Sequence, residues 1–239
     1  MNPQTLARVT GVLFLITYIT SIPAFFVCYA PVLTDPGYIT GAGPDTGVLL
    51  GAFLELLLII ANIGTAVVLF PVLKRQNEVL ALGYVTARLV ECGFIAVGIL
   101  SLVTVVTLRQ EAAGADAASP TLVGQALVAI HDWTFLLGPG FVVGVGNGLM
   151  LGYLMYRSGL VPRPMAVLGL IGGPLVCASG VAVLFGVLEQ GGVEQSIAAI
   201  PEFFWELSLG IYLTVKGFRP SAATSESART ATHELVAAA

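Results

Sequence analysis

The sequence predicts an all-α fold: a polytopic membrane helix bundle of six transmembrane helices with both termini in the cytoplasm. Three observations carry this prediction. Hydrophobic side chains make up 56% of the 239 residues and charged ones 10%, whereas soluble domains carry about 25% charged residues. Several apolar runs reach about 18 residues, the length at which a run indicates a membrane-spanning helix. The basic residues gather in alternate connections between these runs.

The first two spans are predicted at the N-terminal end. The apolar run over residues 9–27 is long for the core of a signal peptide, so we interpret it as a retained helix. Residues 28–47 are rich in Pro, Gly and Asp and contain no Lys or Arg, which indicates a loop. The second helix is predicted over residues 48–73, and a basic pair at 74–75 ends it.

The third and fourth spans are separated by a polar connection. Residues 79–107 form an apolar run that predicts the third helix. Residues 121–137 are mildly amphipathic, and the sequence leaves open whether they lie in the membrane. The Gly138–Pro139–Gly140 stretch predicts a kink or a helix boundary, so the fourth span is assigned to residues 138–156.

The last two spans complete one transmembrane domain over residues 1–218. The fifth helix is predicted over residues 165–188. The sixth is predicted over residues 201–215, because Pro201 suits the first turn of a helix. Residues 219–239 have the composition of a disordered tail.

The distribution of positive charge predicts the orientation. In a six-span arrangement, Arg109 alone falls on one side and Arg88 lies within a span, while the other Lys and Arg residues share the opposite side. The positive-inside rule therefore places both termini, and the tail, in the cytoplasm. The net charge of −4 has no block of like charge, so nucleic acid is not expected as a partner.

A row of glycines marks the fourth span as a packing helix. Gly140, Gly144, Gly148 and Gly152 recur every four residues and so share one ridge of a helix. Small residues on such a ridge let another helix approach closely in lipid. We expect a neighbouring helix to use this ridge, either from the same chain or from a second copy in a homo-oligomer.

Polar and charged residues within or near the spans are the candidate ligand-binding groups, because such residues are costly in a membrane and by default either functional or paired. Counting about 1.5 Å per residue from the basic ends sorts them into two layers. The middle layer holds Asn62, Arg88, Asn147 and Glu206, and the outer layer holds Glu55, Glu91, His131 and Asp132.

Each layer has a plain interpretation and a functional one. In the middle layer, Arg88 and Glu206 form a structural ion pair or belong to a proton or substrate relay. In the outer layer, Glu55, Glu91 and His131 are ligand types that suit zinc or another divalent metal. The plain alternative there is an interfacial anchor with a satisfied imidazole. The sequence establishes no cofactor, and no P-loop, nucleophile-elbow or dinucleotide fingerprint is present.

Several stretches, among them HDWTFLLGPGF, LGYLMYRSGLVPRPMAVLGLIG and WELSLGIYLTVKGF, together resemble the domain-of-unknown-function 4386 family of bacterial polytopic membrane proteins. The resemblance covers nearly the whole chain up to Phe218. It implies a multi-pass protein of the bacterial inner membrane and brings no activity with it.

Three functions stay open from the sequence. The first, which the carboxylates and amides favour, is a small-ligand or ion binding or transport protein with a polar cavity. The second is an intramembrane enzyme, metal-dependent or not, with Glu and His residues at the outer face. The third is a structural or accessory membrane protein whose charges fix the helix register.

Overall fold

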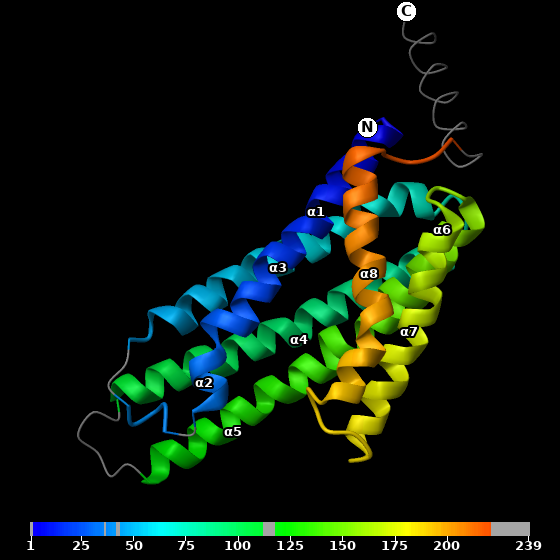
Figure 1. Cartoon of the computed structure of the whole chain (residues 1–239). Coiled ribbons are helices and arrows are strands. Elements are labelled where there is room, and N and C mark those ends of the chain that lie inside the picture. The colour runs from blue at the N-terminus through cyan, green and yellow to red at the C-terminus, as the bar shows by residue number, and fades with distance from the viewer. Residues whose placement is uncertain (1, 36, 42–43, 112–117, 221–239) are drawn as a thin grey trace, which may run out of the picture.

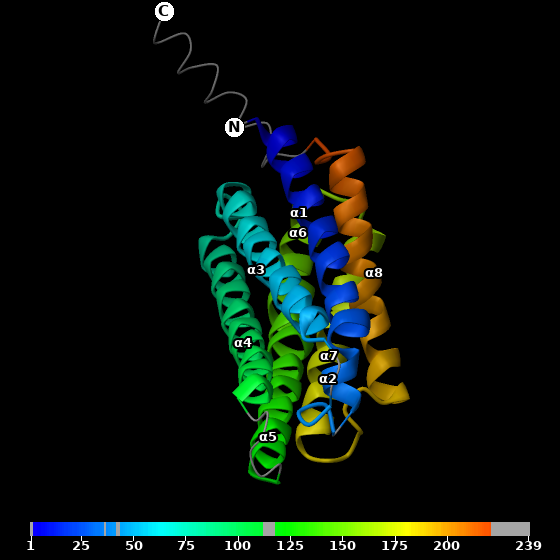
Figure 2. The same cartoon turned by 90° about the vertical axis from the view of Figure 1, so that its left-hand side faces the viewer.

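The computed structural model describes residues 2–35, 37–41, 44–111 and 118–220, and every secondary-structure element in this part of the chain is a helix (Figures 1 and 2). The elements in order are α1 (Pro3–Pro23), η1 (Ala24–Cys28), α2 (Ala30–Thr34), α3 (Thr46–Leu73), α4 (Glu78–Glu111), α5 (Ala118–Phe135), η2 (Leu136–Val142), η3 (Gly144–Leu151), α6 (Gly152–Ser158), α7 (Arg163–Leu184) and α8 (Val193–Val215). The η segments are π-helical. The predicted all-α class is confirmed, and the predicted tail lies almost wholly outside the described residues.

Five helical stretches are long and apolar enough to cross a membrane: Pro3–Cys28, Thr46–Leu73, Glu78–Glu111, Pro120–Ser158 and Arg163–Leu184. They correspond to the first five predicted spans and are consistent with an integral membrane protein. Helix α8 is not among them. Its Glu202 and Glu206 lower the hydropathy of an otherwise apolar helix, although α8 packs beside α1 and α7.

The fourth stretch corrects the boundary predicted at Gly138–Pro139–Gly140. Helices α5 and α6 continue into one another through η2 and η3, so residues 121–137 belong to the same helical rod as 138–156. The proline lies within a π-helical turn, and the helical rod continues through it. At about 1.5 Å per residue, a 39-residue rod is longer than the roughly 30 Å hydrocarbon core.

Two further boundaries differ from the prediction. Helix α8 begins at Val193 rather than Pro201, and Pro201 lies inside the helix. Helix α7 ends at Leu184, earlier than the predicted residue 188. The predicted loop over residues 28–47 contains the short helix α2. These differences arise because tertiary packing extends or shortens helices beyond what local residue preferences dictate.

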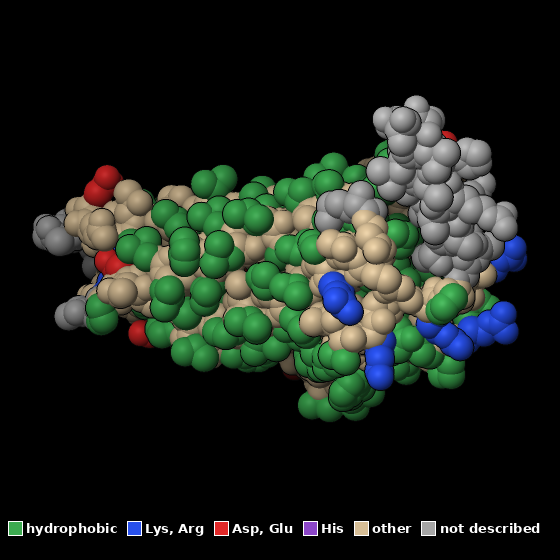
Figure 3. Space-filling model, turned by 90° about the horizontal axis from the view of Figure 1, so that it is seen from above, with side chains coloured by type: hydrophobic (Ala, Val, Ile, Leu, Met, Phe, Trp, Pro, Cys, Tyr) green, Lys and Arg blue, Asp and Glu red, His purple; other side chains and the backbone are tan. Residues whose placement is uncertain are grey.

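The two ends of the bundle differ in charge. In the view of Figure 3, Lys and Arg gather at one end, Asp and Glu appear at the other, and hydrophobic side chains cover the sides between them. The first turn of α1 lies at the same end as the C-terminus of α8, since Gln4 and Phe218 exchange two hydrogen bonds of 2.8 and 3.0 Å (Figure 1). We call the end where Lys and Arg gather the basic end and the opposite end the acidic end.

Three glycines of the ridge predicted on the fourth span, Gly144, Gly148 and Gly152, pack against α7 of the same chain, whereas Gly140 meets only its own helical stretch among the described residues. A Cβ built on Gly144 would lie 2.7 Å from the carbonyl oxygen of Gly173, and one on Gly152 would lie 3.4 Å from the amide nitrogen of Leu170. Gly148 also meets Gly173. Small residues on both helices therefore let their backbones meet. This close approach brings the η3 segment and α7 up to α8.

Candidate functional site

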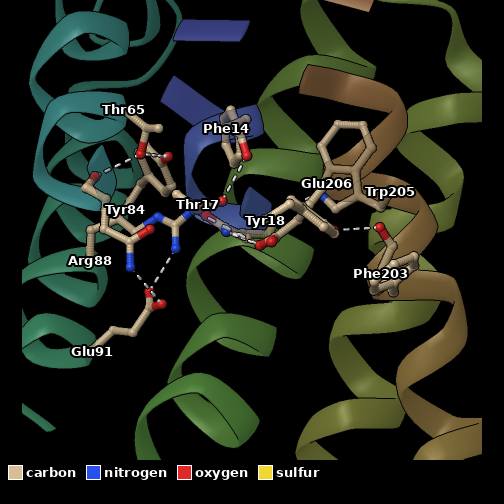
Figure 4. A network of polar contacts seen from close by, with 12 residues as sticks. Phe14, Thr17, Tyr18, Thr65, Tyr84, Arg88, Glu91, Phe203, Trp205 and Glu206 are labelled. Atoms are coloured by element: carbon tan, nitrogen blue, oxygen red, sulfur yellow. Dashed lines mark hydrogen bonds and ion pairs between the residues drawn. The ribbon is translucent and has the colours of Figure 1, made fainter. Parts of the chain in front are cut away.

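Arg88 on α4 lies in a group of buried carboxylates. In the described part of the chain it is the only cation among them. Its side chain is 3% exposed, and its Nη1 lies 2.7 Å from Oε2 of Glu91, one turn further along the helix. Asn62 on α3 donates a 3.1 Å hydrogen bond to the other oxygen of Glu91. Figure 4 shows Arg88 reaching toward Glu91, with Tyr84 beside it. The pair is thus held from two helices.

Helix α8 approaches the same guanidinium from the other side. Oε1 of Glu206 lies 3.9 Å from Nη2 of Arg88. The same oxygen accepts a hydrogen bond from the side-chain amide of Asn147, which lies in η3. Trp205, fully buried, donates a 3.0 Å hydrogen bond from Nε1 to the carbonyl oxygen of Asn147. The π-helical segment and α8 are thereby fixed together at the level of Arg88.

Glu202 is the residue that the sequence analysis did not select. It is 4% exposed, and neither carboxylate oxygen has a hydrogen-bond partner within the described part of the chain. It lies close enough to Glu206, Arg88 and Glu91 to interact with their charges. The sequence carried the signal, because Glu202 and Glu206 are four residues apart and so share one helix face, but the sequence analysis named only Glu206.

Two glycines on neighbouring helices pack closely against the Glu202 carboxylate. Its Oε2 would be 2.7 Å from a Cβ built on Gly148 and 2.8 Å from one built on Gly172. Helices η3 and α7 therefore press their backbones against the carboxylate. A residue larger than glycine at either place would displace it.

We define the acid cluster as Arg88, Glu91, Glu202 and Glu206, with the amides of Asn62 and Asn147. Three carboxylates there face one guanidinium, so full ionisation would leave the cluster with an excess of negative charge. Two guanidinium nitrogens of Arg88, Nε and Nη2, lack a hydrogen-bond partner among the described residues, as does Oδ1 of Asn147. The cluster is polar, buried and only partly satisfied.

This geometry changes the layers predicted from the sequence. The four middle-layer residues come together as expected, but Glu91 joins them and does not pair with Glu55. The reason is that side chains on a helix lean toward its N-terminus, so Glu91 leans back toward Arg88. The predicted pair of Arg88 with Glu206 is secondary, because Glu91 lies 1.2 Å closer to the guanidinium, at 2.7 Å against 3.9 Å.

The remaining outer-layer residues form a second group. Tyr29, fully buried, donates a 2.9 Å hydrogen bond to Oε2 of Glu55. Its ring packs edge-on against His131, with ring centroids 5.5 Å apart. His131 is 2% exposed, and its Nδ1 lies 3.7 Å from Oδ1 of Asp132. We call Tyr29, Glu55 and His131 the tyrosine–histidine group.

The structure does not assemble the metal ligands suggested by the sequence. Among the described residues, no group of three or more His, Cys, Asp or Glu side chains could hold a metal ion. Glu91 is engaged with Arg88, while Glu55 and His131 flank Tyr29. A pocket of about 180 Å³ lies near the acidic end, lined by residues including Asp35, Tyr38 and Gln125, and no member of the acid cluster lines it.

A second arginine, Arg109, holds the loop at the acidic end. Its Nη1 lies 2.5 Å from Oδ1 of Asp45, and its Nη2 donates a 2.7 Å hydrogen bond to the carbonyl oxygen of Gly41. The guanidinium also lies over the ring of Tyr38, 4.6 Å from the centroid. Burial raises the pKa of Tyr38 above its usual value, and the neighbouring Arg109 charge opposes that rise. We call Arg109, Asp45, Gly41 and Tyr38 the loop clamp.

Comparison with known protein families identifies one family. The model described as "Domain of unknown function (DUF4386)" matches residues 9–217, and the chain belongs to this family. The match covers all the candidate residues above and confirms the resemblance found in the sequence. Comparisons with curated proteins and with solved structures find no match.

Proposed function

We propose that this member of the DUF4386 family is a proton-linked transport protein that moves a small ligand or ion, and that the acid cluster is its proton-binding site. The observation that carries the proposal is the buried Glu202 carboxylate, which has no hydrogen-bond partner among the described residues and stands among two further carboxylates and one guanidinium.

The argument rests on the cost of uncompensated charge. Removing a carboxylate from water costs several kcal/mol even after the protein relaxes, and only a close opposite charge offsets it. Arg88 offers one positive charge and is already paired with Glu91. Each proton bound by a carboxylate lowers the excess negative charge by one without any new contact. A cluster of this kind gains or loses protons when its partners move, which is what a proton-linked transporter requires.

Close packing favours the proton over a larger cation in this conformation. The glycine backbones of η3 and α7 lie against Glu202, and Asn62 and Asn147 occupy oxygens of the neighbouring carboxylates. A larger ligand would need the helices to separate. The π-helical segment beside the cluster suits such a movement, because π-helical turns are frequent at functional sites.

The proposal includes a sixth span and an orientation. Helix α8 carries Glu202 and Glu206 inward and exposes Phe203, Phe204 and Ile211, as a membrane helix with one polar face would. The basic end faces the cytoplasm under the positive-inside rule, which places both termini there. The setting proposed is the inner membrane of a bacterium, in keeping with the family resemblance.

A proton-flux experiment tests the function. The protein is reconstituted into vesicles that contain a pH-sensitive dye, and a potassium gradient with valinomycin drives protons inward. The assay is run with and without an external mixture of small amines, amino acids and sugars. We expect faster acidification than in empty vesicles, and we expect Glu202→Gln to abolish the difference.

Glu194→Gln is the matched control, since Glu194 lies on the same helix but is exposed in its first turn. This variant should keep the flux of the unmodified protein. Equal flux in protein-containing and empty vesicles under every condition would contradict the proposal. Equal flux in the two glutamine variants would show that Glu202 is not the proton site.

A structural role is the second candidate, and the hydrogen bonds that join α3, α4, η3 and α8 at the cluster favour it. In that case the polar contacts would fix the helix register. The same vesicles separate the two candidates, because a structural protein would show no flux with any substrate.

A further inference from the structure

We infer that the tyrosine–histidine group is a second proton-binding site, located toward the acidic end and separate from the acid cluster. The proton adds to Nδ1 of His131 and gives an imidazolium ion between two carboxylates, Glu55 and Asp132. No covalent bond other than the N–H bond changes, and the proton comes from water at the acidic end.

The side chains come from three elements that meet at this level. Tyr29 follows η1, Glu55 lies on α3, and His131 lies on α5. The Tyr29 hydroxyl binds Glu55 while the Tyr29 ring contacts His131, so one residue holds the other two in place. Phe25 stacks over the imidazole, with ring centroids 6.5 Å apart. These contacts fix the imidazole plane.

His131 carries an unused polar atom. Nδ1 is buried and has no hydrogen-bond partner among the described residues. Leaving a buried polar atom without a partner costs about 1–3 kcal/mol. Such an atom in a native structure points to an exchangeable proton or to a bound water, and both suit a proton-binding site.

Two carboxyl groups neighbour the imidazole. Asp132, from the same helix, places a carboxylate oxygen 3.7 Å from Nδ1. Glu55, from α3, is close enough for its charge to interact with that of His131. Cys28 lies close enough to Tyr29 to interact with it electrostatically. Helix α4 faces the ring at Gly98, where an added Cβ would lie 3.4 Å from Cδ2 of the imidazole. Two acidic neighbours stabilise an imidazolium ion.

Asp132 connects the group to water. Its side chain is 49% exposed, whereas that of His131 is 3% exposed. His131 lies 27 residues from Ser158, about 40 Å along the fourth helical rod, which puts it beyond a hydrocarbon core of roughly 30 Å that starts at the basic end. Protons can therefore pass between the aqueous phase and Nδ1 by way of one exposed carboxylate.

The second site also lies in line with the acid cluster. Glu55 and Asn62 are seven residues apart on α3 and share a face, with an axial separation of about 10 Å. Asn62 binds Glu91. The tyrosine–histidine group therefore lies on the side from which protons would reach the acid cluster.

The chain allows a direct test, because its only histidines are His131 and His233. The full chain with His233→Gln, labelled with ¹⁵N-histidine and held in lipid nanodiscs, reports His131 alone by solid-state NMR. We expect an imidazolium signal to appear as the pH is lowered from 8 to 5. At a fixed pH within that range, Glu55→Gln should lower the ratio of imidazolium to imidazole by about three- to tenfold, because one stabilising charge is lost.

Asp132→Asn provides a second variant at an exposed position, in case Glu55→Gln does not fold, and it should lower the same ratio. Glu194→Gln is the control and should leave the ratio unchanged. An imidazole that stays neutral down to pH 5 would overturn the inference, and so would a ratio that neither acidic variant alters. The readout is at His131 and does not depend on flux through the acid cluster, so the two proposals fail separately.

Discussion

Arg88 and Arg109 are both largely buried, yet their surroundings differ in the balance of charge. In the loop clamp, the Arg109 guanidinium meets the Asp45 carboxylate, binds the carbonyl oxygen of Gly41 and lies over a tyrosine ring. In the acid cluster, one guanidinium meets three carboxylates and leaves two of its nitrogens without a hydrogen bond among the described residues.

This difference in charge balance distinguishes a structural feature from a functional site. A balanced ion pair with hydrogen bonds on every side has one stable arrangement and fixes a loop. An excess of carboxylates cannot be satisfied in one arrangement without taking up a proton or another cation. The loop clamp therefore has the properties of a structural feature, and the acid cluster has those of a site with an exchangeable occupant. The predictions below test this contrast in order of expected size.

Removal of the Arg88 charge should cause the largest loss. Arg88→Leu leaves Glu91, Glu202 and Glu206 without their cation, and removing one partner of a buried pair typically costs about 3–5 kcal/mol. We expect a strong drop in the thermal unfolding temperature of the detergent-solubilised protein. Arg88→Lys, which keeps the charge, should lose much less.

A double-mutant cycle refines this result. Glu91→Leu and Glu206→Leu are each combined with Arg88→Leu, and the coupling energy should be larger for Glu91, which lies 2.7 Å from the guanidinium against 3.9 Å for Glu206. Additive losses for both glutamates would contradict the described pairing.

Packing around the acid cluster should be the next most sensitive feature. A Cβ on Gly173 would lie 2.5 Å from the carbonyl oxygen of Gly144, so Gly173→Ala must push α7 away from η3. Overpacking of this kind costs about 1–3 kcal/mol. Gly93 on α4 is the control, since a Cβ there meets nothing within 4 Å. Equal unfolding temperatures for Gly173→Ala and Gly93→Ala would refute the close helix contact.

Loss of the loop clamp should have a smaller and more local effect. Arg109→Ala removes the ion pair with Asp45 and the contact with Tyr38, at a cost of about 1–2 kcal/mol for charge-assisted hydrogen bonds near the surface. Limited proteolysis should show faster cleavage near residues 35–45. Proton flux should stay at the level of the unmodified protein, and a loss of flux would show that the clamp does more than hold the loop.

Glu202→Gln should have the smallest effect on stability. Glutamine keeps the shape of the side chain and removes a carboxylate that has no hydrogen-bond partner in the described part of the chain, so the unfolding temperature should stay constant or rise. A clear fall would mean that the ionised carboxylate is a needed counter-ion of Arg88.

Much of the fold could be predicted from the sequence, because long apolar runs leave few alternatives to membrane helices. The five helical stretches that are long and apolar enough to cross a membrane follow from these runs. The continuity of the fourth rod through Pro139 could not be predicted, since a π-helical turn has no sequence signature that separates it from a break. The start of α8 was missed because a proline usually marks the first turn of a helix, whereas Pro201 lies inside α8.

The candidate site was predicted in its membership more than in its arrangement. A polar residue inside an apolar run is visible in the sequence, and this is how Asn62, Arg88 and Asn147 were found. The direction of a side chain is not visible, so Glu91 was assigned to the wrong layer and Glu202 was passed over. Only the packing of η3, α7 and α8 shows that the Glu202 carboxylate is enclosed with no hydrogen-bond partner from the residues that the structure describes.

The protonation state of the acid cluster is the measurement that tests the central claim most directly. Infrared difference spectroscopy of the protein in lipid, recorded between acidic and alkaline pH, detects the carbonyl stretch of a protonated carboxylic acid. We predict such a band in the unmodified protein and in Glu194→Gln, and its loss in Glu202→Gln. If the band is absent at every pH, or if it persists unchanged in Glu202→Gln, the acid cluster does not hold its proton at Glu202 and the proposed proton linkage is wrong.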